Sequence, residues 1–335
     1  MSGSPRTLLV VGATGQQGGA VLAALSKLLS EPGNNATNTQ RPKVLALTRS
    51  APDSPKAQAL TARYPSLDLT VVQGDTKDPA PIFAAHPDIT SVFLYTTPPD
   101  EAAQALPLLN HMFTWSSSKV QHVVFSSVDR GGDAASWENP TEIAHFKSKH
   151  EIEVRLRDLC GGQKDSSSSS SSRPPIKYTI LRPVAFMDNL NPGSLFGPVF
   201  ASMWATMPAD RPLQVVSVRD IGIFGAKALL QMGSPGDDDK WSNRAIGLAG
   251  QELRFEEVQE IFRRVSGGQK ELPQAPWIVG KGVRWAIGEV GTMFRFFEEK
   301  GYGVDITALR KRESELQDLE TWLKESSKFE FGNAA

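Results

Sequence analysis

The stretch that decides the fold is Thr7–Gly19, TLLVVGATGQQGG, near the amino terminus. Its first part, Thr7–Val11, is an unbroken run of aliphatic and β-branched residues, and it passes directly into a glycine-rich segment. The residues after Gly19 carry apolar side chains at helical spacing, which predicts one buried helix face. The stretch therefore predicts a buried strand, a glycine turn and an amphipathic helix; the apolar helix positions are Val21, Leu22, Leu25, Leu28 and Leu29.

The glycines of this turn have separate physical uses. Gly12 allows the tight turn out of the strand, Gly15 lets a pyrophosphate approach the backbone, and Gly18 lets helix and strand pack closely. The helix amino terminus adds unpaired N–H groups and positive dipole density, which favour phosphate. The alternative is an ordinary glycine turn without a ligand. We expect a dinucleotide site with loop contacts from Gly12, Thr14, Gly15, Gln16, Gln17 and Gly18.

Short aliphatic runs alternate with helical segments through the first half of the chain. The runs are nearly continuous in hydrophobic residues, as expected for parallel strands that are buried on both faces. This alternation predicts an α/β fold with a Rossmann-type, doubly wound parallel sheet. The predicted strands are Thr7–Val11, Val44–Thr48, Leu69–Gln73, Ser91–Thr96, His122–Ser126, Tyr178–Leu181 and Ala245–Leu248.

The last third of the chain predicts a smaller, α-rich domain for a substrate or partner. Phe255–Val265 (FEEVQEIFRRV) is a strongly amphipathic helix, and leucines keep helical spacing up to Leu323. We expect the Rossmann domain over residues 5–183 and the strand near 244–249, and the smaller domain over residues 184–243 and 250–328. Two polar, breaker-rich stretches, Glu31–Pro42 and Cys160–Pro175, are interpreted as surface insertions in the Rossmann domain.

Composition and charge exclude several classes of function. The 335 residues carry 36 Lys+Arg against 37 Asp+Glu, so no basic surface for nucleic acid or a membrane is expected. No window reaches the ~20 apolar residues that cross a bilayer, and no signal-peptide pattern opens the sequence. Cys160 is the only cysteine and the 5 histidines lack paired ligand spacing, so neither a disulfide nor a metal site is expected. These features predict a cytoplasmic protein.

The ends of the second and third predicted strands indicate which dinucleotide binds. The second strand ends at Thr48-Arg49-Ser50, where an acidic residue usually holds the free ribose of NAD. Arginine suits the extra phosphate of NADP, because its guanidinium forms a charge-assisted fork with that group. We therefore expect NADP(H), with Arg49 and Ser50 as contacts; the alternative is a solvated surface arginine. Asp75, just beyond the third strand, is either an adenine contact or the cap of the next helix.

Hydroxyl groups follow the fourth and fifth strands, at the sheet edge where such folds bind ligands. Thr96 and Thr97 come before a Pro-Pro pair, and Ser126 and Ser127 end the fifth apolar run. We expect the two threonines and Ser126 to contact the cofactor and Ser127 to contact the substrate. The alternative is that these hydroxyls fix a loop.

Apolar side chains after the sixth predicted strand are candidates for a substrate pocket. The segment Val184–Leu190 (VAFMDNL) should cross toward the second domain, and an aromatic-rich segment follows it. Apolar residues at such a crossing can equally belong to the core. The candidates are Phe186, Met187, Asn189 and Trp204, with Phe196, Phe200 and Met203 beside them as an apolar wall.

From about Thr7 to Leu323 the chain resembles the NmrA-like family of the atypical short-chain dehydrogenase/reductase superfamily. The resemblance implies NADP binding on a Rossmann fold, with Pro183 at the cofactor. This family mixes NADP-dependent reductases with redox-sensing regulators that bind dinucleotide without turnover. Fungal members are common, many in secondary metabolism, so a fungal origin is expected. The matching motifs are the GATGxxGG loop, Arg49, His145–Lys149 (HFKSK), Leu181–Pro183 (LRP), Val218–Gly222 (VRDIG), Leu248–Gly250 (LAG) and Phe255–Val258 (FEEV).

Typical members of the superfamily use Tyr-x-x-x-Lys on a helix, and here His145 and Lys149 fill that offset. Side chains four residues apart share one helix face. The helix is expected from about Pro140 to Leu159. The resemblance implies that Lys149 holds the nicotinamide ribose, whereas the alternative is a surface lysine. His145 is a general acid/base, a cofactor-positioning residue or an ordinary helix histidine. The tyrosine is absent, which departs from the typical pattern.

Three functions follow as hypotheses. The first is an NADPH-dependent oxidoreductase that reduces a carbonyl, enone or imine of a small apolar metabolite, with His145, a strand-end hydroxyl or water as proton donor. The second is a dinucleotide-sensing regulator that binds a protein partner through the α-rich domain. The third is a non-redox catalyst that keeps NADP as a structural element.

Overall fold

The computed structural model describes residues 6–31, 41–162, 175–193, 196–231, 238–268 and 270–331. Most of the two predicted insertions lies outside these residues. The chain forms two compact units, each built from three segments. Unit 1 consists of Met1–Ser127, Ser148–Leu181 and Ile221–Ile246, and unit 2 consists of Val128–Lys147, Arg182–Asp220 and Gly247–Ala335.

A seven-stranded sheet in the order β3-β2-β1-β4-β5-β6-β9 forms the centre of unit 1. From β3 through β6, every neighbouring pair of strands runs parallel, which confirms the predicted Rossmann-type fold. The inner strands β1 and β5 are buried along their whole length, as their continuous apolar runs predict. The strands are β1 (Thr7–Val11), β2 (Lys43–Thr48), β3 (Asp68–Gln73), β4 (Ile89–Tyr95), β5 (His122–Ser126), β6 (Lys177–Pro183) and β9 (Arg244–Leu248).

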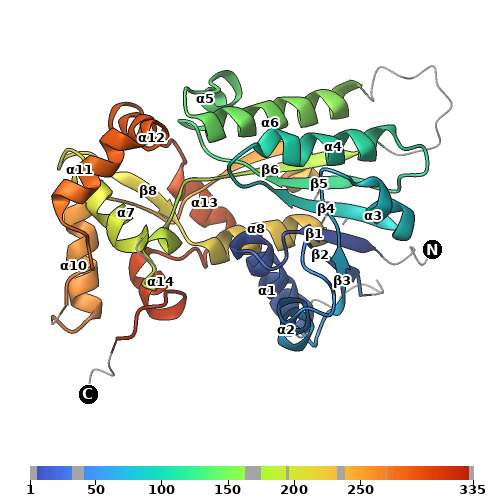
Figure 1. Cartoon of the computed structure of the whole chain (residues 1–335), viewed down its shortest axis with the longest axis horizontal. Helices are drawn as coiled ribbons and strands as arrows, with labels where there is room; N and C mark the ends of the chain where they lie inside the picture. Colours follow the sequence, from blue (N-terminus) through green and yellow to red (C-terminus); the bar gives the residue numbers. More distant parts are fainter. Residues whose placement is uncertain are drawn as a thin grey trace. The chain divides into compact units, whose positions relative to one another are not determined.

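Helices cover both faces of this sheet (Figure 1). On one face α8 packs closely on α1, where a Cβ on Gly222 would lie 2.5 Å from the carbonyl of Ala20. On the other face α4 and α6 are joined by Arg155, whose guanidinium donates to the Asn110 side chain at 2.8 Å. The helices are α1 (Gln16–Ser30), α2 (Pro55–Arg63) and α8 (Val218–Gln231) on the first face, and α3 (Ala80–Ala85), α4 (Glu101–Thr114) and α6 (Ala144–Gly162) on the second.

The observed units differ from the predicted domains in two longer segments, and also at residues 182–183 and 247–249, which belong to unit 2. Most of α8 belongs to unit 1 rather than to the smaller domain, because its glycines let it lie against α1 and the sheet. Residues 128–147 belong to unit 2, because the Asp129 carboxylate accepts hydrogen bonds from the N–H groups of Gly131 and Gly303, at 3.0 and 2.8 Å. Neither contact has a local sequence signal.

Unit 2 combines many helices with a small sheet of order β10-β8-β7. The helical character of the carboxyl-terminal part agrees with the prediction, whereas the small sheet was not predicted. Its strands are β7 (Ala185–Phe186), β8 (Leu213–Val216) and β10 (Gln251–Leu253). The helices are α5 (Asp133–Glu138), η1 (Met187–Leu190), α7 (Phe196–Ala205), α10 (Phe255–Val265), α11 (Trp277–Ala286), α12 (Gly288–Glu299), α13 (Ile306–Arg312) and α14 (Leu319–Glu325).

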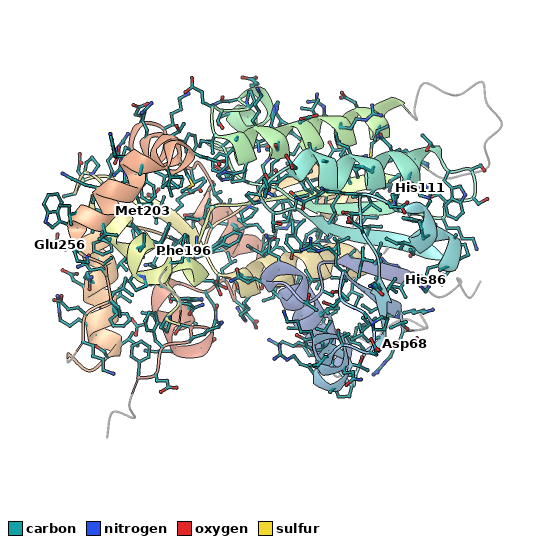
Figure 2. The ribbon with its side chains drawn as sticks, viewed as in Figure 1. Asp68, His86, His111, Phe196, Met203 and Glu256 are labelled. Atoms are coloured by element: carbon teal, nitrogen blue, oxygen red, sulfur yellow. The ribbon has the colours of Figure 1, made fainter. Side chains whose placement is uncertain are left out.

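Aromatic and aliphatic side chains share the core of unit 2. The Phe200 ring packs on Trp204 and Phe294, each at 6.3 Å between ring centroids. Figure 2 shows Phe196 and Met203 on α7; Met203 is buried in this core, whereas Phe196 is exposed. Each buried ring removes a large apolar area from water and so favours folding.

Candidate functional site

The glycine loop of unit 1 has the backbone that a dinucleotide diphosphate requires. Gly12 has a φ of +63°, a left-handed conformation that favours glycine, and the Gly15 N–H donates to its carbonyl at 2.8 Å. A Cβ on Gly18 would lie 2.4 Å from the Gly12 oxygen, so only glycine lets α1 start this close to β1. Gly15 is the N-cap of α1 and has no side chain to cap the helix. The first-turn N–H groups of α1 therefore suit a phosphate, as in other helix amino termini.

Tyr95, at the end of β4, lies against this loop. The register pairs Val10 with Phe93, so the residues two positions later, Gly12 and Tyr95, are neighbours at the sheet edge. The phenol hydroxyl donates to the Gly12 carbonyl at 3.4 Å. A Cβ on Gly15 would lie 2.1 Å from the phenol oxygen of Tyr95. Burial raises the pKa of Tyr95 above its ordinary value, and the Arg49 cation partly offsets this rise. The space left by the missing side chains of Gly12 and Gly15 is thus occupied by the Tyr95 ring and its hydroxyl.

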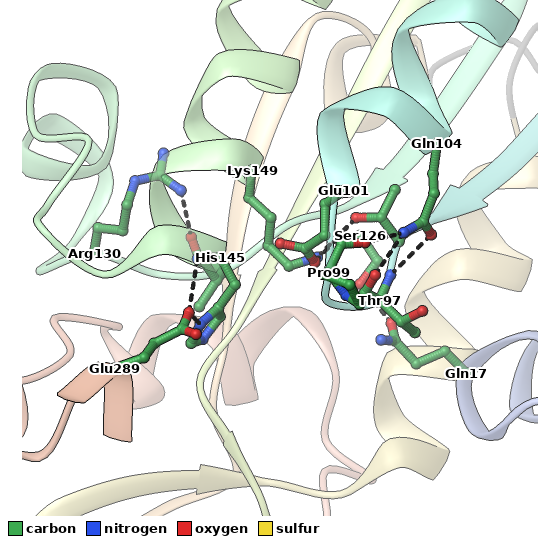
Figure 3. A network of polar contacts seen from close by, with 12 residues as sticks. Gln17, Thr97, Pro99, Glu101, Gln104, Ser126, Arg130, His145, Lys149 and Glu289 are labelled. Atoms are coloured by element: carbon green, nitrogen blue, oxygen red, sulfur yellow. Dashed lines mark hydrogen bonds and ion pairs between the residues drawn. The ribbon is translucent and has the colours of Figure 1, made fainter. Parts of the chain in front are cut away.

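A buried polar cluster lies at the carboxyl end of β4 (Figure 3). The Lys149 ammonium lies 3.1 Å from a Glu101 carboxylate oxygen and donates to the Thr96 hydroxyl at 3.2 Å. The hydroxyl in turn donates to Glu101 at 3.3 Å. Glu101 is 1% exposed and Lys149 is 8% exposed, and in the described structure the second Glu101 oxygen, Oε2, has no hydrogen-bond partner. The cluster brings together two residues that the sequence separately predicts as cofactor contacts, Thr96 and Lys149, and adds a buried carboxylate.

Strand β5 contributes two hydroxyls beside this cluster. Register pairs Tyr95 with Ser126, which sets Thr96 and Ser127 at the same sheet edge. The Ser126 hydroxyl donates to the Gln17 side chain at 2.6 Å, which links β5 to the first turn of α1 (Figure 3). Ser127 is buried, and its hydroxyl has no partner among the described residues. At this end of the sheet, the Ser126 hydroxyl is thus hydrogen-bonded, whereas the buried Ser127 hydroxyl has no hydrogen-bond partner among the described residues.

Thr97 is held by backbone contacts. The Gln104 side chain accepts from the Thr97 N–H at 3.3 Å and donates to the Thr97 and Pro99 carbonyls at 2.6 and 2.8 Å. The Thr97 side chain is exposed. Gln104 thus fixes the turn between β4 and α4, which holds Glu101 at the start of α4 (Figure 3).

The residues predicted at the adenosine end lie at the ends of β2 and β3. Arg49 is exposed, and the Ser50 N–H donates to the Thr48 hydroxyl at 3.1 Å. An exposed guanidinium at this position has the charge and the N–H donors to bind the 2′-phosphate of NADP. Asp75 is also exposed, and its carboxylate accepts the Lys77 N–H at 2.9 Å within a turn. It does not cap the next helix, because the N-cap of α3 is Pro79.

In unit 2, His145 is hydrogen-bonded to a carboxylate. Its Nδ1 lies 2.7 Å from a Glu289 oxygen, which also accepts the His145 backbone N–H at 3.1 Å. This hydrogen bond is the main cause of the lowered pKa of Glu289. If Nδ1 carries the proton, the neutral ring keeps Nε2 as an acceptor, which suits a base as well as a fixed helix residue.

Two of the predicted substrate residues belong to the core of unit 2. Met187 is 0% exposed and Trp204 is 1% exposed, since both pack in its aromatic core, and Phe200 and Met203 lie with them. These side chains present no surface to a ligand here, so core packing explains them. The remaining candidates, Phe186 and Asn189, are half-buried, and Pro183 is buried at the end of β6.

The described residues give no support for a metal site, a cysteine nucleophile or a membrane-spanning helix. They contain no cluster of three or more His, Cys, Asp or Glu side chains that could hold a metal ion. Burial raises the pKa of the Cys160 thiol to about 12, which disfavours the nucleophilic thiolate. Among the described helices, none has the length and apolarity to span a membrane.

Sequence reasoning missed Tyr95, Glu101 and Gln104. Tyr95 lies inside the predicted strand Ser91–Thr96, and neither Glu101 nor Gln104 belongs to a motif. Tyr95 and Glu101 sit immediately around the predicted Thr96–Thr97 pair, which was the one signal that could have found them. Their partners lie far along the chain, at Gly12 and Lys149, and only the fold brings these together.

Several solved structures share this fold. An NADPH-dependent quinone oxidoreductase of Escherichia coli, complexed with NADPH, has a TM-score of 0.65 and 18% identity, over 95% of this chain and 98% of that one. NmrA, a negative transcriptional regulator in complex with NAD, has a TM-score of 0.65 and 20% identity, over 97% and 96%. A triphenylmethane reductase of Citrobacter sp. has a TM-score of 0.64 and 18% identity, over 97% and 100%. At these identities the likeness shows the fold alone.

The comparison with family models goes further than the fold. No curated protein matches the chain. The model of the NmrA-like family matches residues 4–323, nearly the whole chain. That range contains the glycine loop, the buried Lys149 cluster and most of unit 2. A match of this extent, together with the glycine loop and the parallel sheet, shows that the chain belongs to the NmrA-like family.

Proposed function

We propose that this protein binds NADP(H) and is an NADPH-dependent oxidoreductase that reduces a carbonyl, enone or imine of a small apolar metabolite. The observation that carries the proposal is the buried Lys149–Glu101–Thr96 cluster at the sheet edge that also bears the glycine loop. A buried charge pair is costly to desolvate, and this pair lies at the carboxyl ends of the strands, where such sheets bind ligands. The solved structures of a quinone oxidoreductase with NADPH and a triphenylmethane reductase with NADP(H) support it.

The residues of unit 1 would share the binding of the dinucleotide. The glycine loop and the α1 amino terminus would hold the diphosphate, and Arg49 the 2′-phosphate. Lys149, fixed by Glu101 and Thr96, would donate to the hydroxyls of the nicotinamide ribose. NADPH, when bound, supplies the hydride.

The proton needs a separate source, because His145 stands where the superfamily has tyrosine. The candidates on this chain are His145 and the unsatisfied Ser127 hydroxyl, with bound water as a third source. Ser127 would donate a hydrogen bond to the substrate oxygen and polarise the bond that is reduced. His145→Phe and Ser127→Ala separate these roles, since loss of turnover with intact NADPH binding identifies the donor.

Calorimetric titration of dinucleotide-free protein with NADP and NADPH tests the proposal first. We expect tight NADPH binding that Arg49→Ala weakens. Quinones, enones and imines then serve as acceptors with NADPH deuterated at the transferred position. Lys149→Met should abolish turnover, whereas Lys147→Met, an exposed position on the same helix, should not. Absence of deuterium from every product would contradict the oxidoreductase.

A dinucleotide-sensing regulator is the second candidate, because α11 exposes three large apolar side chains, with the Lys281 ammonium over the ring of one of them, Trp277. Trp277, Ile278 and Trp285 are 63%, 65% and 88% exposed, and their spacing places them on one side of the helix. Exposed aromatic patches often mark protein interfaces. NmrA, a negative transcriptional regulator, is solved with NAD and with NADP. This reading requires that partner binding respond differently to NADP and NADPH; an equal response would exclude it.

A further inference from the structure

Tyr95 occupies a position on the glycine loop that neither the family match nor the sequence motifs assign. Its ring ends where side chains at two loop positions would otherwise project: a Cβ on Gly12 would lie 2.6 Å from its Cε1, and a Cβ on Gly15 would lie 2.1 Å from its hydroxyl. Gly15 is also the N-cap of α1. The phenol hydroxyl is therefore adjacent to the helix end whose N–H groups suit a phosphate.

This hydroxyl has a hydrogen to give. Its bond to the Gly12 carbonyl is 3.4 Å long, whereas strong O–H···O bonds are about 2.5–3.0 Å. Tyr95 as a whole is half-buried. Charge from Arg49 acts on the phenol, which indicates a positive local potential at this edge. An anion at the loop would meet both a neutral donor and a positive field.

We propose that the Tyr95 hydroxyl donates a hydrogen bond to the diphosphate of the bound dinucleotide, which makes Tyr95 a cofactor-positioning residue. The inference rests on the proposed NADP(H) binding. A hydroxyl that donates to a phosphate oxygen forms a charge-assisted bond, stronger than its bond to the Gly12 carbonyl. Tyr95 precedes Thr96, so the same turn that carries the Lys149 cluster also carries this donor. The end of β4 would thereby contact the diphosphate through Tyr95 and fix the ribose-binding Lys149 through Thr96.

The test compares two probes, of which only one carries the diphosphate. NADPH carries the 2′-phosphate, the diphosphate and the nicotinamide riboside, whereas 2′-AMP is adenosine with the 2′-phosphate and carries neither of the other two groups. Tyr95→Phe removes the hydroxyl and keeps the ring that fills the room beside Gly12 and Gly15. Loss of one charge-assisted hydrogen bond should weaken NADPH binding about tenfold and leave 2′-AMP binding unchanged. Arg49→Ala should weaken both probes, because both carry the 2′-phosphate.

A second phenol in unit 1 provides the matched control. The Tyr64 hydroxyl donates to a backbone carbonyl of α1, that of Gly19, at 3.3 Å, and this residue is buried. Tyr64→Phe therefore removes a comparable phenol-to-carbonyl hydrogen bond without touching the loop, whose Gly12 carbonyl accepts from Tyr95. We expect NADPH binding within twofold of the unaltered protein for Tyr64→Phe.

Each other result overturns the inference in a recognisable way. Equal or tighter NADPH binding by Tyr95→Phe would mean that the phenol covers the loop instead of contacting the diphosphate. Loss of 2′-AMP binding as well would mean that the hydroxyl maintains the fold of the loop. Failure of the unaltered protein to bind NADPH would overturn the proposed function together with the inference, whereas the first two results leave NADPH binding in place.

Discussion

Lys149 and Glu101 show how a single pair of residues links the site to the stability of unit 1. Both side chains are buried, at 8% and 1% exposure, and their charged atoms are 3.1 Å apart. Removing one partner of a buried ion pair leaves an uncompensated charge, whereas removing both leaves none. The pair therefore behaves as a unit with respect to substitution.

We expect Lys149→Met to lower the free energy of unfolding by about 3 kcal/mol, because the Glu101 charge would remain buried and alone. The double variant Lys149→Met/Glu101→Gln should lose less than the sum of the two single variants. Urea unfolding of the four proteins gives the coupling energy. Lys147→Met is the control, with a change below about 0.5 kcal/mol. Additive losses would show that the two charges do not interact.

Asp220, at the start of α8, should make the stability of the protein depend on pH. Desolvation raises its pKa from 3.8 to about 6, although the carboxylate accepts the Gln317 N–H at 2.9 Å and pairs with Arg219. The folded protein thus binds this proton more tightly than the unfolded chain does. Protonated Asp220 therefore stabilises the folded state. This stabilisation is complete below about pH 4 and is lost as the pH rises through about 6, which lowers the free energy of unfolding by up to about 3 kcal/mol.

Urea unfolding at pH 7.5 and pH 5 of the unaltered protein and of Asp220→Asn measures this contribution. Other groups titrate in both proteins, so the difference between the two pH dependences isolates Asp220. The unaltered protein should gain more stability at pH 5 than the variant gains. Identical pH dependences would show that the pKa of Asp220 is not raised in the folded state.

Individual site residues were predictable where their chemistry was local. The glycine loop, Thr96 and Lys149 carry signals within a few neighbouring positions, and the structure places each at the edge of unit 1. Glu101 carries no such signal, because its role depends on a lysine 48 residues later in the chain, at Lys149. Met187 and Trp204 illustrate the opposite error, since an apolar side chain near a crossing looks the same whether it lines a pocket or a core.

Among the elements, the buried parallel strands were the most predictable. Each of the seven predicted runs overlaps an observed strand. The inner strands are buried on both faces and leave a continuous apolar run, whereas the outer strands β3 and β9 are partly exposed. The helix Phe255–Val265 also has its predicted bounds. Strands β7, β8 and β10 are 2, 4 and 3 residues long, too short to show any period. The position of α8 against α1 depends on close packing at glycines such as Gly222, and the spacing of apolar residues in the sequence does not predict such packing.

The contact between α8 and α1 gives a prediction at the scale of elements. A Cβ on Gly222 would lie 2.5 Å from the backbone of Ala20, so Gly222→Ala must push the helices apart. We expect it to lower the free energy of unfolding by about 1–3 kcal/mol. The matched control is Gly282→Ala in α11, where a Cβ would meet nothing within 4 Å. That change should stabilise by about 0.5–1 kcal/mol, because alanine favours helix. Thermal and urea unfolding distinguish the two signs, and equal effects would contradict the close contact.

For the whole molecule, the division into two units predicts an uneven response to the dinucleotide. All the proposed NADPH contacts except Pro183 belong to unit 1. At a concentration of 100 times the dissociation constant, a ligand that binds only the folded state adds about 2.7 kcal/mol of stability. Hydrogen exchange should therefore slow most in β1, the glycine loop and the ends of β4 and β5. Uniform protection of both units, or protection confined to unit 2, would contradict this placement.

The interleaving of the two units also has a consequence for biosynthesis. The chain passes between them at five points, after residues 127, 147, 181, 220 and 246. Strand β9, the last of the large sheet in chain order, ends at Leu248, so that sheet cannot be completed on the ribosome until the chain up to this residue has emerged. Recombination between genes could likewise not exchange either unit as one continuous piece. The nascent chain must hold a partly assembled sheet while most of unit 2 is still being made, and a trailing truncation would leave the sheet intact only if it fell beyond β9.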